Sequence, residues 1–334
     1  MKKLRIAMVG VGHDHAAATL EVLNRLNDIF DLVGWCLTPD DNPELPKQNE
    51  IYSKVKQYSY DEILAMDDLE AVAIECEDNY LSTHAIRFIK KGLHVHMDKP
   101  GGQNKQEFDE MIELAKKSDK QFHTGYMYRY NMALEEAFKI VKSGKLGRVY
   151  SVETEMGCIH PDSKRKWLGK FEGGMMNFLG CHLIDIIVRI LGFPKEVIPL
   201  NFSTYDGQSK PEDVGVAILK YDNAIGYAKA SALECGGLMR RQVVITGTEG
   251  TIEICPTEYY EDGGMFSDMR VNLLSDRGYD WLYRAPIKTY GPTSRYDSMM
   301  RDFYECTQGK ENQFTLDYEQ KLHDVVLKAC GLLK

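Results

Sequence analysis

Over the first 124 residues, short apolar runs alternate with segments in which hydrophobic residues recur at helical spacing. The apolar runs predict strands and the other segments predict helices: strands at 4–12, 31–38, 70–76, 93–97 and 121–127, and helices at 15–28, 61–66, 81–92 and 105–119. Strands that alternate with helices indicate βαβ units and a parallel sheet. We therefore expect an α/β fold for residues 1–124, with a doubly wound parallel sheet of the Rossmann type.

After about residue 125 the pattern changes to long strand-like segments with few helices between them. We expect strands within 148–157, 196–207, 214–234, 241–255 and 269–276, and helices at 133–144, 177–192, 294–309 and 317–333. Consecutive strands without intervening helices favour antiparallel pairing. Residues 125–334 are therefore predicted to form an α+β domain with a large, mostly antiparallel sheet.

Composition narrows the class of protein. The 334 residues are 43% hydrophobic and 27% charged, which is ordinary for a globular protein. The net charge of −9 and the lack of a basic stripe argue against a nucleic-acid partner. No apolar run approaches the roughly 18 residues of a membrane span, and the first residues include no cleavable apolar segment, so we expect a cytoplasmic protein without a membrane partner. The eight cysteines form no C-x-x-C pair, so neither a metal site nor a disulfide framework is predicted.

The first predicted strand ends in a glycine-containing turn, ahead of a predicted helix. A dinucleotide-binding turn needs two glycines, one for the tight turn and one for close approach of the backbone to a pyrophosphate. Gly10 and Gly12 meet this need, whereas His15 replaces the third glycine of G-x-G-x-x-G. We interpret the whole turn as cofactor-binding, the alternative being a plain strand–helix turn. Its residues are Gly10, Val11, Gly12, His13, Asp14 and His15.

The end of the second predicted strand leaves the choice of cofactor open. An acidic residue there normally binds the adenosine ribose. Leu37 takes that place, followed by Thr38, and we expect Asp40 and Asp41 to lie too far out. No basic residue follows at once to hold a 2′-phosphate. The expected cofactor is therefore NAD or NADP, with discrimination below about tenfold, or roughly 1.4 kcal/mol.

Lys99 follows shortly after the predicted strand 93–97. It stands between Asp98 and Pro100, and two glycines come after the proline. Ligands of doubly wound sheets bind at the carboxyl ends of the strands. We therefore predict that Lys99 faces a crevice between the domains, near a nicotinamide ring. A partly desolvated lysine can exchange a proton with a substrate hydroxyl near neutral pH. An exposed lysine in a loop is an equally compatible reading of the position.

Polar residues form a stripe on the otherwise apolar predicted helix 177–192. His182, Asp185 and Arg189 fall on one face, and polar groups on such a helix need partners. The stripe is either a structural hydrogen-bond network or part of a substrate site. In the second case His182 faces the substrate, Asp185 orients its ring, and Asn177 adds a polar contact.

In order and spacing, these motifs resemble the Gfo/Idh/MocA oxidoreductases, the family of glucose–fructose oxidoreductase and inositol 2-dehydrogenase. The resemblance covers nearly the whole chain and includes the glycine turn. It implies that residues 1–124 form a dinucleotide-binding Rossmann domain and that residues 125–334 form a substrate-binding and oligomerisation domain with an open-faced sheet. "MDKP" resembles the family's Glu-Lys-Pro, and "TGYMYRYN" resembles its Gly-Phe-x-x-Arg-Phe segment. "GGMMNFLGCHLID" resembles its glycine-rich turn followed by His-x-x-Asp, and "TGTEGTIEI" resembles its Gly-Thr-x-Gly turn.

The resemblance implies NAD(P)-dependent hydride transfer at a carbinol carbon of a sugar, polyol, inositol or related carbohydrate. Lys99 and His182 become the expected acid/base and substrate-orienting pair. Asp98, Lys99 and Arg129 join the expected cofactor-binding residues, and Tyr126 joins the substrate-binding ones. The resemblance also implies a cis peptide bond between Lys99 and Pro100.

One departure from the family puts its usual proton path in doubt. Many members have an aspartate four residues before the histidine, where this chain has Phe178. Trp167 either stacks on a sugar in the substrate site or is a structural aromatic. The basic run 164–166 either meets an acidic substrate or is solvated.

Two alternatives to a dehydrogenase stay open. One is a cofactor-binding sensor or assembly protein without redox turnover, and the other is a redox-cycling hydrolase or lyase that keeps its NAD bound. The open face of the second sheet would expose Ile218, Tyr227 and Val244 unless a second copy covers it. We therefore predict a homodimer or homotetramer.

Overall fold

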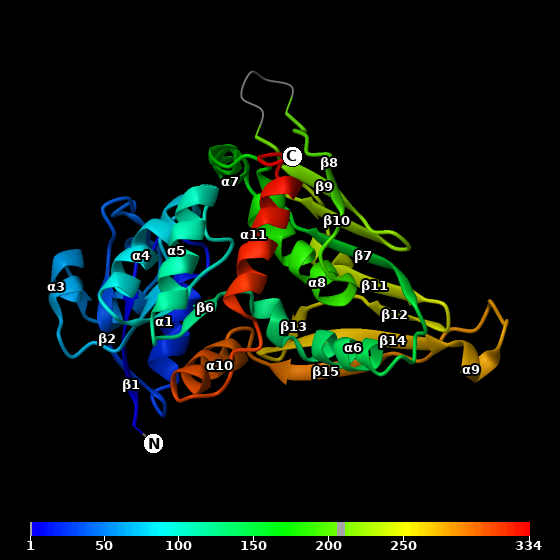
Figure 1. The fold of residues 1–334 in the computed structure, drawn as a ribbon, viewed down its shortest axis with the longest axis horizontal. Helices are drawn as coiled ribbons and strands as arrows, with labels where there is room; N and C mark the ends of the chain where they lie inside the picture. The colour runs from blue at the N-terminus through cyan, green and yellow to red at the C-terminus, as the bar shows by residue number, and fades with distance from the viewer. Residues whose placement is uncertain (1, 206–210) are drawn as a thin grey trace. The chain divides into compact units, whose positions relative to one another are not determined.

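The structure, a computed structural model, describes residues 2–205 and 211–334, and it divides into two compact units (Figure 1). The first unit comprises 1–127 with 296–323, and the second comprises 128–295 with 324–334. The sequence suggested a single crossing between residues 124 and 125. After residue 295 the chain returns to the first unit. The helix α10 (Asp297–Thr307), the first of the two helices near the end of the chain, therefore belongs to that unit.

The described part of the first unit contains a six-stranded parallel sheet in the order β3-β2-β1-β4-β5-β6. This is the strand order of dinucleotide-binding α/β domains, and the Rossmann-type prediction is confirmed. The short edge strand β3 was not predicted, because two residues carry no periodic pattern. The strands are β1 (Leu4–Val9), β2 (Phe30–Cys36), β3 (Gln57–Tyr58), β4 (Ala71–Ile74), β5 (His94–Met97) and β6 (Phe122–Thr124).

Helices cover this sheet. Ile63, Phe88 and Met111, from α3, α4 and α5, pack with Val72 and Val95 of the sheet in one buried cluster. Capping fixes two helix starts, since Ser59 forms a capping box with Glu62 at α3, and the Asn104 side chain accepts the Glu107 N–H at α5. Besides α10, the helices are α1 (Ala16–Arg25), α2 (Ile51–Lys54), α3 (Tyr60–Ala65), α4 (Leu81–Lys90) and α5 (Lys105–Lys117), with short 3-10 turns at Leu45–Gln48 and Asp78–Tyr80.

The second unit is built on a nine-stranded sheet, counted over its described residues, in the order β13-β14-β12-β11-β7-β10-β9-β8 with β15 paired to β14. β7 and β10 are parallel and the other pairs are antiparallel, so the prediction of a mostly antiparallel sheet is confirmed. The strands are β7 (Val149–Gly157), β8 (Glu196–Pro199), β9 (Val214–Lys220), β10 (Ile225–Ser231), β11 (Gln242–Gly247), β12 (Gly250–Ile254), β13 (Tyr259–Glu261), β14 (Gly264–Leu273) and β15 (Lys288–Thr293).

Several expected elements differ in detail. The strand expected at 196–207 ends at Pro199, and residues 206 and 207 lie outside the described part of the chain. β13 and β15 were not predicted. The basic run 164–166, for which a solvated loop was one of the two expectations, lies in the short helix α7 (Asp162–Trp167). The remaining helices are α6 (Met132–Lys142), α8 (Cys181–Leu191), α9 (Leu274–Arg277) and α11 (Leu316–Ala329), with a π-helical segment at Met176–Gly180 and 3-10 turns at Met127–Tyr130, Leu168–Lys170 and Gly237–Arg240.

The two faces of the second sheet differ in burial. Ala217, Leu219, Val243 and Ile245 point to the face that is fully buried, where α8 packs on β7 and β10 and α6 packs near β12 and β14. The alternate residues Ile218, Tyr227 and Val244 are half-buried on the other face. Among the described helices, none combines the length and apolar character that a membrane crossing requires.

Candidate functional site

The turn after β1 packs tightly against the residues that follow β4. Gly10 has a φ of +91°, and a Cβ there would lie 2.5 Å from the Cys76 backbone nitrogen. A Cβ on Gly12 would lie 2.5 Å from the Glu77 nitrogen and 2.7 Å from Asp41 Oδ1. Both positions therefore require glycine. The turn therefore has the two glycines that a dinucleotide-binding turn requires. Both glycines are needed because the turn packs closely against the backbone that follows β4.

Asp41 lies at this turn, which corrects the expectation that it is too far out. Its Oδ2 accepts the N–H of Val11 at 3.1 Å and of Thr38 at 2.8 Å, because residues 38–41 form a turn closed by the Asp41 N–H and the Thr38 carbonyl. Burial raises the pKa of this carboxyl group. Oδ1 has no hydrogen-bond partner among the described residues. An acidic side chain therefore stands beside the glycine turn, while Leu37 is half-buried and Thr38 is buried.

Lys99 lies just beyond the carboxyl end of β5, as predicted, and its side chain is fully buried rather than exposed. The Asp98 carboxylate accepts the backbone N–H of Lys99 at 2.6 Å. The ring of His13 lies 3.1 Å from the Lys99 carbonyl oxygen through Nε2. Contacts to the N–H and to the carbonyl oxygen of Lys99 therefore hold its backbone in place. The Lys99–Pro100 bond is cis, which confirms that prediction.

Beneath the glycine turn lies a fully buried group of ionisable side chains. Asp98 Oδ2 is 2.9 Å from His15 Nδ1 and 3.2 Å from His13 Nδ1. Glu75 Oε2 is 3.7 Å from His13 Nδ1. Burial lowers the pKa of His13 to about 3. Burial, followed by the neighbouring Asp98 carboxyl, raises the pKa of Glu75 well above its usual range. Of the other candidates in this unit, Asp14 is exposed and Tyr126 is buried.

In the second unit, α8 begins at the predicted substrate-binding residues. Asn177 is buried on the π-helical segment that precedes α8, and His182 is buried in the first turn of α8. The His182 ring meets the ring of Tyr128 edge-on, with centroids 5.0 Å apart. The sequence did not single out Tyr128, because a tyrosine in an aromatic-rich segment carries no distinctive signal.

Asp185 contacts a partner that the sequence reading did not assign to it. Arg129 donates from Nε to Asp185 Oδ2 at 3.1 Å and from Nη2 to Oδ1 at 2.9 Å, and both side chains are buried. This two-pronged ion pair joins the 3-10 turn at Met127–Tyr130 to α8. The stripe on α8 is therefore at least partly a structural network. Its third member, Arg189, lies over the Phe138 ring at 3.8 Å.

Trp167 belongs to an aromatic cluster with Phe171 and Phe178, at centroid distances of 4.8 and 5.7 Å. The ammonium of Lys164 lies 3.4 Å from the centre of the Trp167 ring and 4.7 Å from that of Phe178. Phe178, at the position where many family members have an aspartate, thus serves aromatic packing. Within the basic run, Lys164 is placed over these rings, and the other two residues form ion pairs with Asp213 and Asp162.

A second buried network was missed by sequence reasoning. The Tyr128 hydroxyl donates to Glu258 Oε1 at 2.7 Å, and Arg241 and Arg295 contact the same carboxylate oxygen. Burial, and then the Glu258 charge, raises the pKa of Tyr128 to about 12. Residues from four separate segments meet here, so no local pattern could reveal the cluster. The network holds the side chain of Tyr128, whose ring packs against His182.

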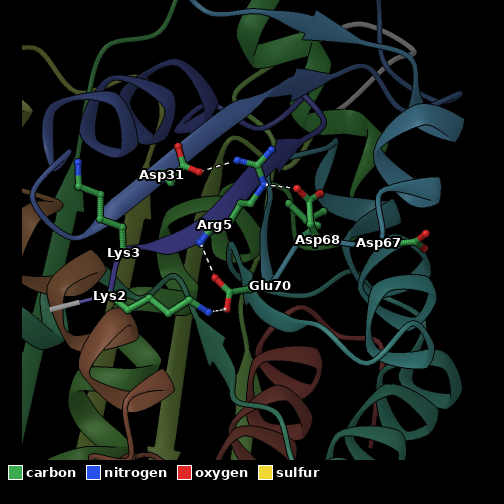
Figure 2. Close-up of a pocket in the computed structure, with 8 residues that line it drawn as sticks. Lys2, Lys3, Arg5, Asp31, Asp67, Asp68 and Glu70 are labelled. Atoms are coloured by element: carbon green, nitrogen blue, oxygen red, sulfur yellow. Dashed lines mark hydrogen bonds and ion pairs between the residues drawn. The ribbon is translucent and has the colours of Figure 1, made fainter.

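A surface hollow at the start of β1 is not the candidate site. It is lined by Lys2, Lys3, Arg5, Asp31, Asp67, Asp68, Leu69 and Glu70 (Figure 2). Arg5 forms ion pairs there with Asp31 at 2.6 Å and with Asp68 at 3.1 Å. The hollow lies at the amino end of β1, whereas ligands of such sheets bind at the carboxyl ends. Most of its charges are paired with one another, Lys2 with Glu70 and Arg5 with Asp31 and Asp68.

Comparison with known proteins agrees with this architecture. The model of an oxidoreductase family with an NAD-binding Rossmann fold, GFO/IDH/MocA, matches residues 4–126. The model of the GFO/IDH/MocA C-terminal domain matches residues 134–253. The two matches fall on the two sheets described above and together cover well over half of the chain.

Individual relatives are distant. The uncharacterised oxidoreductase YhhX of Escherichia coli is 27% identical over 188 residues, which are 56% of this chain and 54% of that protein. The chain thus spans about half the length of the first curated relatives it matches. D-xylose 1-dehydrogenase (NADP(+)) 2 of Haloferax volcanii is 24% identical over 263 residues, which are 76% of this chain and 74% of that protein.

Among solved structures, levoglucosan dehydrogenase in complex with NADH and levoglucosan superimposes with a TM-score of 0.78 at 18% identity, covering 99% of this chain and 98% of the other. At an identity this low, the structural similarity shows that the two proteins share a fold, and nothing more. The fold, the glycine turn, the Lys99 motif and the two family matches lead to one conclusion: this chain belongs to the Gfo/Idh/MocA family of oxidoreductases, with an NAD-binding Rossmann domain followed by the family's C-terminal domain.

Proposed function

We propose that this protein is an NAD(P)-dependent dehydrogenase that transfers a hydride to or from a carbinol carbon of a sugar, polyol, inositol or related carbohydrate. The observation that carries the proposal is the placement of Lys99, a fully buried lysine fixed by its backbone at the carboxyl end of β5. A desolvated ammonium in a fixed position is suited to proton exchange with a substrate hydroxyl. The xylose and levoglucosan dehydrogenases among the relatives support a carbohydrate substrate.

The residues around the glycine turn fit a dinucleotide. Gly10 and Gly12 give the required turn, and the free Oδ1 of Asp41 offers an acceptor for the hydroxyl groups of a ribose. In this proposal the turn Gly10–His15, Leu37, Thr38 and Asp98 complete the cofactor-binding residues. The bound nicotinamide cofactor supplies or accepts the hydride. Because Asp41 is acidic, we favour NAD over NADP.

His182 and Asn177 of the second unit are assigned to substrate binding, with Trp167 of the same unit and Tyr126 of the first unit as further candidates. His182 would bind and orient a substrate hydroxyl through a ring nitrogen. Asp185 is bonded to Arg129, so we assign this pair to positioning α8 and the segment before it. This positioning role is proposed in addition to the roles expected from the sequence, in which Asp185 orients the histidine ring and Arg129 contacts the cofactor.

The test begins with a screen for reduced-cofactor fluorescence over sugars, polyols, inositols and sugar acids, with NAD and NADP. With a substrate in hand, Lys99→Met should lower kcat by about 10²–10⁴-fold, the range for general acid–base catalysis, with cofactor affinity nearly unchanged. Lys117→Met, an exposed lysine on α5, is the matched control and should keep full turnover.

The other outcomes point to the alternatives. If Lys99→Met folds, binds cofactor and turns over within about threefold of the parent, below the catalytic range, Lys99 has no role in proton transfer. Cofactor binding without turnover across the screen would favour a sensor or assembly protein. Consumption of a carbohydrate without net formation of NADH or NADPH would favour a hydrolase or lyase that recycles its cofactor.

A further inference from the structure

Three large apolar side chains lie almost entirely in solvent at the end of the second sheet where α9 is found (Figure 1). Tyr279, Trp281 and Leu282, in the connection between α9 and β15, are 92%, 87% and 75% exposed. Among the described residues, no other large hydrophobic side chain is as exposed as these three. Single apolar residues on a surface need no explanation, whereas a group of them marks an interaction site.

A hydrogen-bonded turn holds two of these side chains at its tip. The Tyr283 N–H donates to the Asp280 carbonyl oxygen at 3.0 Å, and the Leu282 N–H donates to Asp280 Oδ1 at 3.2 Å. Trp281 and Leu282 therefore occupy the two central positions of a tight turn, where small and polar residues predominate. Because both side chains are so exposed, they add little packing to this chain, and any burial they reach comes from another molecule.

The segment that follows the turn is bonded to the sheet. Arg284 Nη2 donates to both carboxylate oxygens of Glu253 at 2.9 Å. The Ala285 N–H donates to Asn272 Oδ1 at 2.7 Å, and the Ala285 carbonyl oxygen accepts from Arg270 Nη1 at 2.6 Å. The turn is therefore held in place before a partner arrives, which lowers the entropy cost of docking.

A hollow of about 350 Å³ lies beside this turn. Ile140 of α6 and Leu273 of β14 line it, together with Tyr283 and Pro286 from the segment that follows the turn. Because Trp281 stands two residues before Tyr283 in the chain, the projecting side chains and the hollow are neighbours on one surface.

The hollow suits an uncharged aromatic occupant. Its volume falls in the range of pockets that enclose small organic groups, so an aromatic side chain fits in it. Its lining is mostly apolar, and the charged residues in it are two acids and two lysines: Glu136, Asp276, Lys145 and Lys288. Because these charges balance, the hollow attracts neither a cation nor an anion in particular.

A projection beside a hollow of matching character is what a two-fold symmetric contact uses, since both copies then present the same patch. Trp281 of each copy can enter the hollow of the other. Tyr279 and Trp281 of both copies would bury about 600–1,000 Å², at roughly 150–250 Å² for each aromatic side chain. The surfaces that receive them lose a similar area, so the contact reaches about 1,200–2,000 Å², the size of a standard stable interface.

We propose that the turn 279–282 docks on a second copy of this chain, with Trp281 of each copy seated in the hollow of the other. This contact is separate from the open sheet face. The hollow is lined by Val271, whereas the neighbouring Arg270 is in register with Glu253 and, through it, with Val244 of the open face. The contact does not depend on the proposed dehydrogenase activity.

The test uses the full chain, with sedimentation velocity for the particle mass and acrylamide quenching of tryptophan fluorescence. Of the three tryptophans, Trp35 is buried and Trp167 packs in the aromatic cluster described above, so a change in quenching reports on Trp281. In the parent at micromolar concentration we expect Trp281 to be shielded, and dilution that halves the particle mass should expose it. Trp281→Ser should weaken association by more than about 100-fold, because the contact is lost twice in a two-fold interface. Leu332→Ser, at an exposed leucine outside the turn and the hollow, should keep the parent's mass.

Ile140→Arg tests the hollow independently of the turn, because a long charged side chain from α6 would fill it. This variant should associate as weakly as Trp281→Ser. An equimolar mixture of the two variants keeps one intact contact, between the Trp281 of one copy and the open hollow of the other. The mixture should therefore associate more strongly than either variant alone.

Three results would overturn the proposal. A parent that stays monomeric with Trp281 open to acrylamide would leave the turn to a partner of another kind. A parent that assembles while Trp281 stays open to acrylamide would show that another surface makes the contact. A mixture of Trp281→Ser and Ile140→Arg that associates no better than the single variants would show that the side chain does not enter the hollow.

Discussion

Replacing Asp41 with asparagine should change the cofactor preference without unfolding the protein. The carboxylate accepts two backbone N–H groups, at 3.1 Å from Val11 and 2.8 Å from Thr38, and the amide oxygen of asparagine can still accept both. What disappears is the negative charge beside the glycine turn. Two like unit charges about 6 Å apart, at an effective dielectric constant near 20, repel each other by about 3 kcal/mol, which sets the scale of the penalty that we expect for the 2′-phosphate of NADP.

That repulsion corresponds to a preference for NAD of roughly 100-fold, since about 1.4 kcal/mol is tenfold. We expect the parent to bind NADH at least about 100-fold more tightly than NADPH, and Asp41→Asn to bring the two within about tenfold. The position of Asp41 thus replaces the expectation from sequence of weak discrimination.

The assay is titration of protein with NADH and NADPH, followed by cofactor fluorescence, at fixed ionic strength. Asp40→Asn is the matched control, because Asp40 is the exposed neighbour that contacts His84 instead of the glycine turn. It should leave the ratio of the two dissociation constants unchanged. A parent that binds NADPH within tenfold of NADH, or an Asp41→Asn variant with the parent's ratio, would show that Asp41 does not read the ribose.

Three further predictions concern stability and assembly. Arg129→Met should lower the free energy of unfolding by about 3–5 kcal/mol, because it leaves the buried Asp185 carboxylate without its ion pair; urea denaturation measures this, and exposed Arg148→Met should cost less than about 0.5 kcal/mol. Burial lowers the pKa of His84, so the unfolded chain binds more protons and stability should fall as pH drops below about 6.5. The melting temperature of His84→Gln should depend less on pH in that range, and an equal slope would contradict this assignment. Light scattering at micromolar concentration should give a dimer or tetramer, because the open sheet face carries half-buried Ile218, Tyr227 and Val244; a monomer mass would rule this out.

The elements that the sequence predicted well are those whose pattern is local. The strands of the first sheet are continuous apolar runs between turn residues, and the glycine turn after β1 combines a strand, two glycines and a helix within a few residues. The place of Lys99 at a strand end follows from the same local signals. The parallel direction of the strands in the first sheet then follows from the alternation of strands and helices, whereas their order is seen in the structure.

Contacts between residues far apart in the chain were not predicted from the sequence. Asp41 looked too far from the glycine turn, because a count along the chain cannot show that residues 38–41 fold back. Asp185 was paired with His182 by helical spacing, yet its carboxylate is bonded to Arg129, more than fifty residues away. The edge strands β3 and β13 are too short for their hydrophobic pattern to stand out.

By itself, the sequence determined the two kinds of sheet, the glycine turn and the residues at the strand ends, because hydrophobic periodicity and turn chemistry act over a few residues. Only the tertiary structure decided how buried charges are paired. Glu75, Asp98, His13 and His15 come from three separate turns that meet because parallel strands end at one edge of the sheet. Whether such groups lie within bonding distance depends on how the chain closes these turns, and that is set by the packing of the whole sheet.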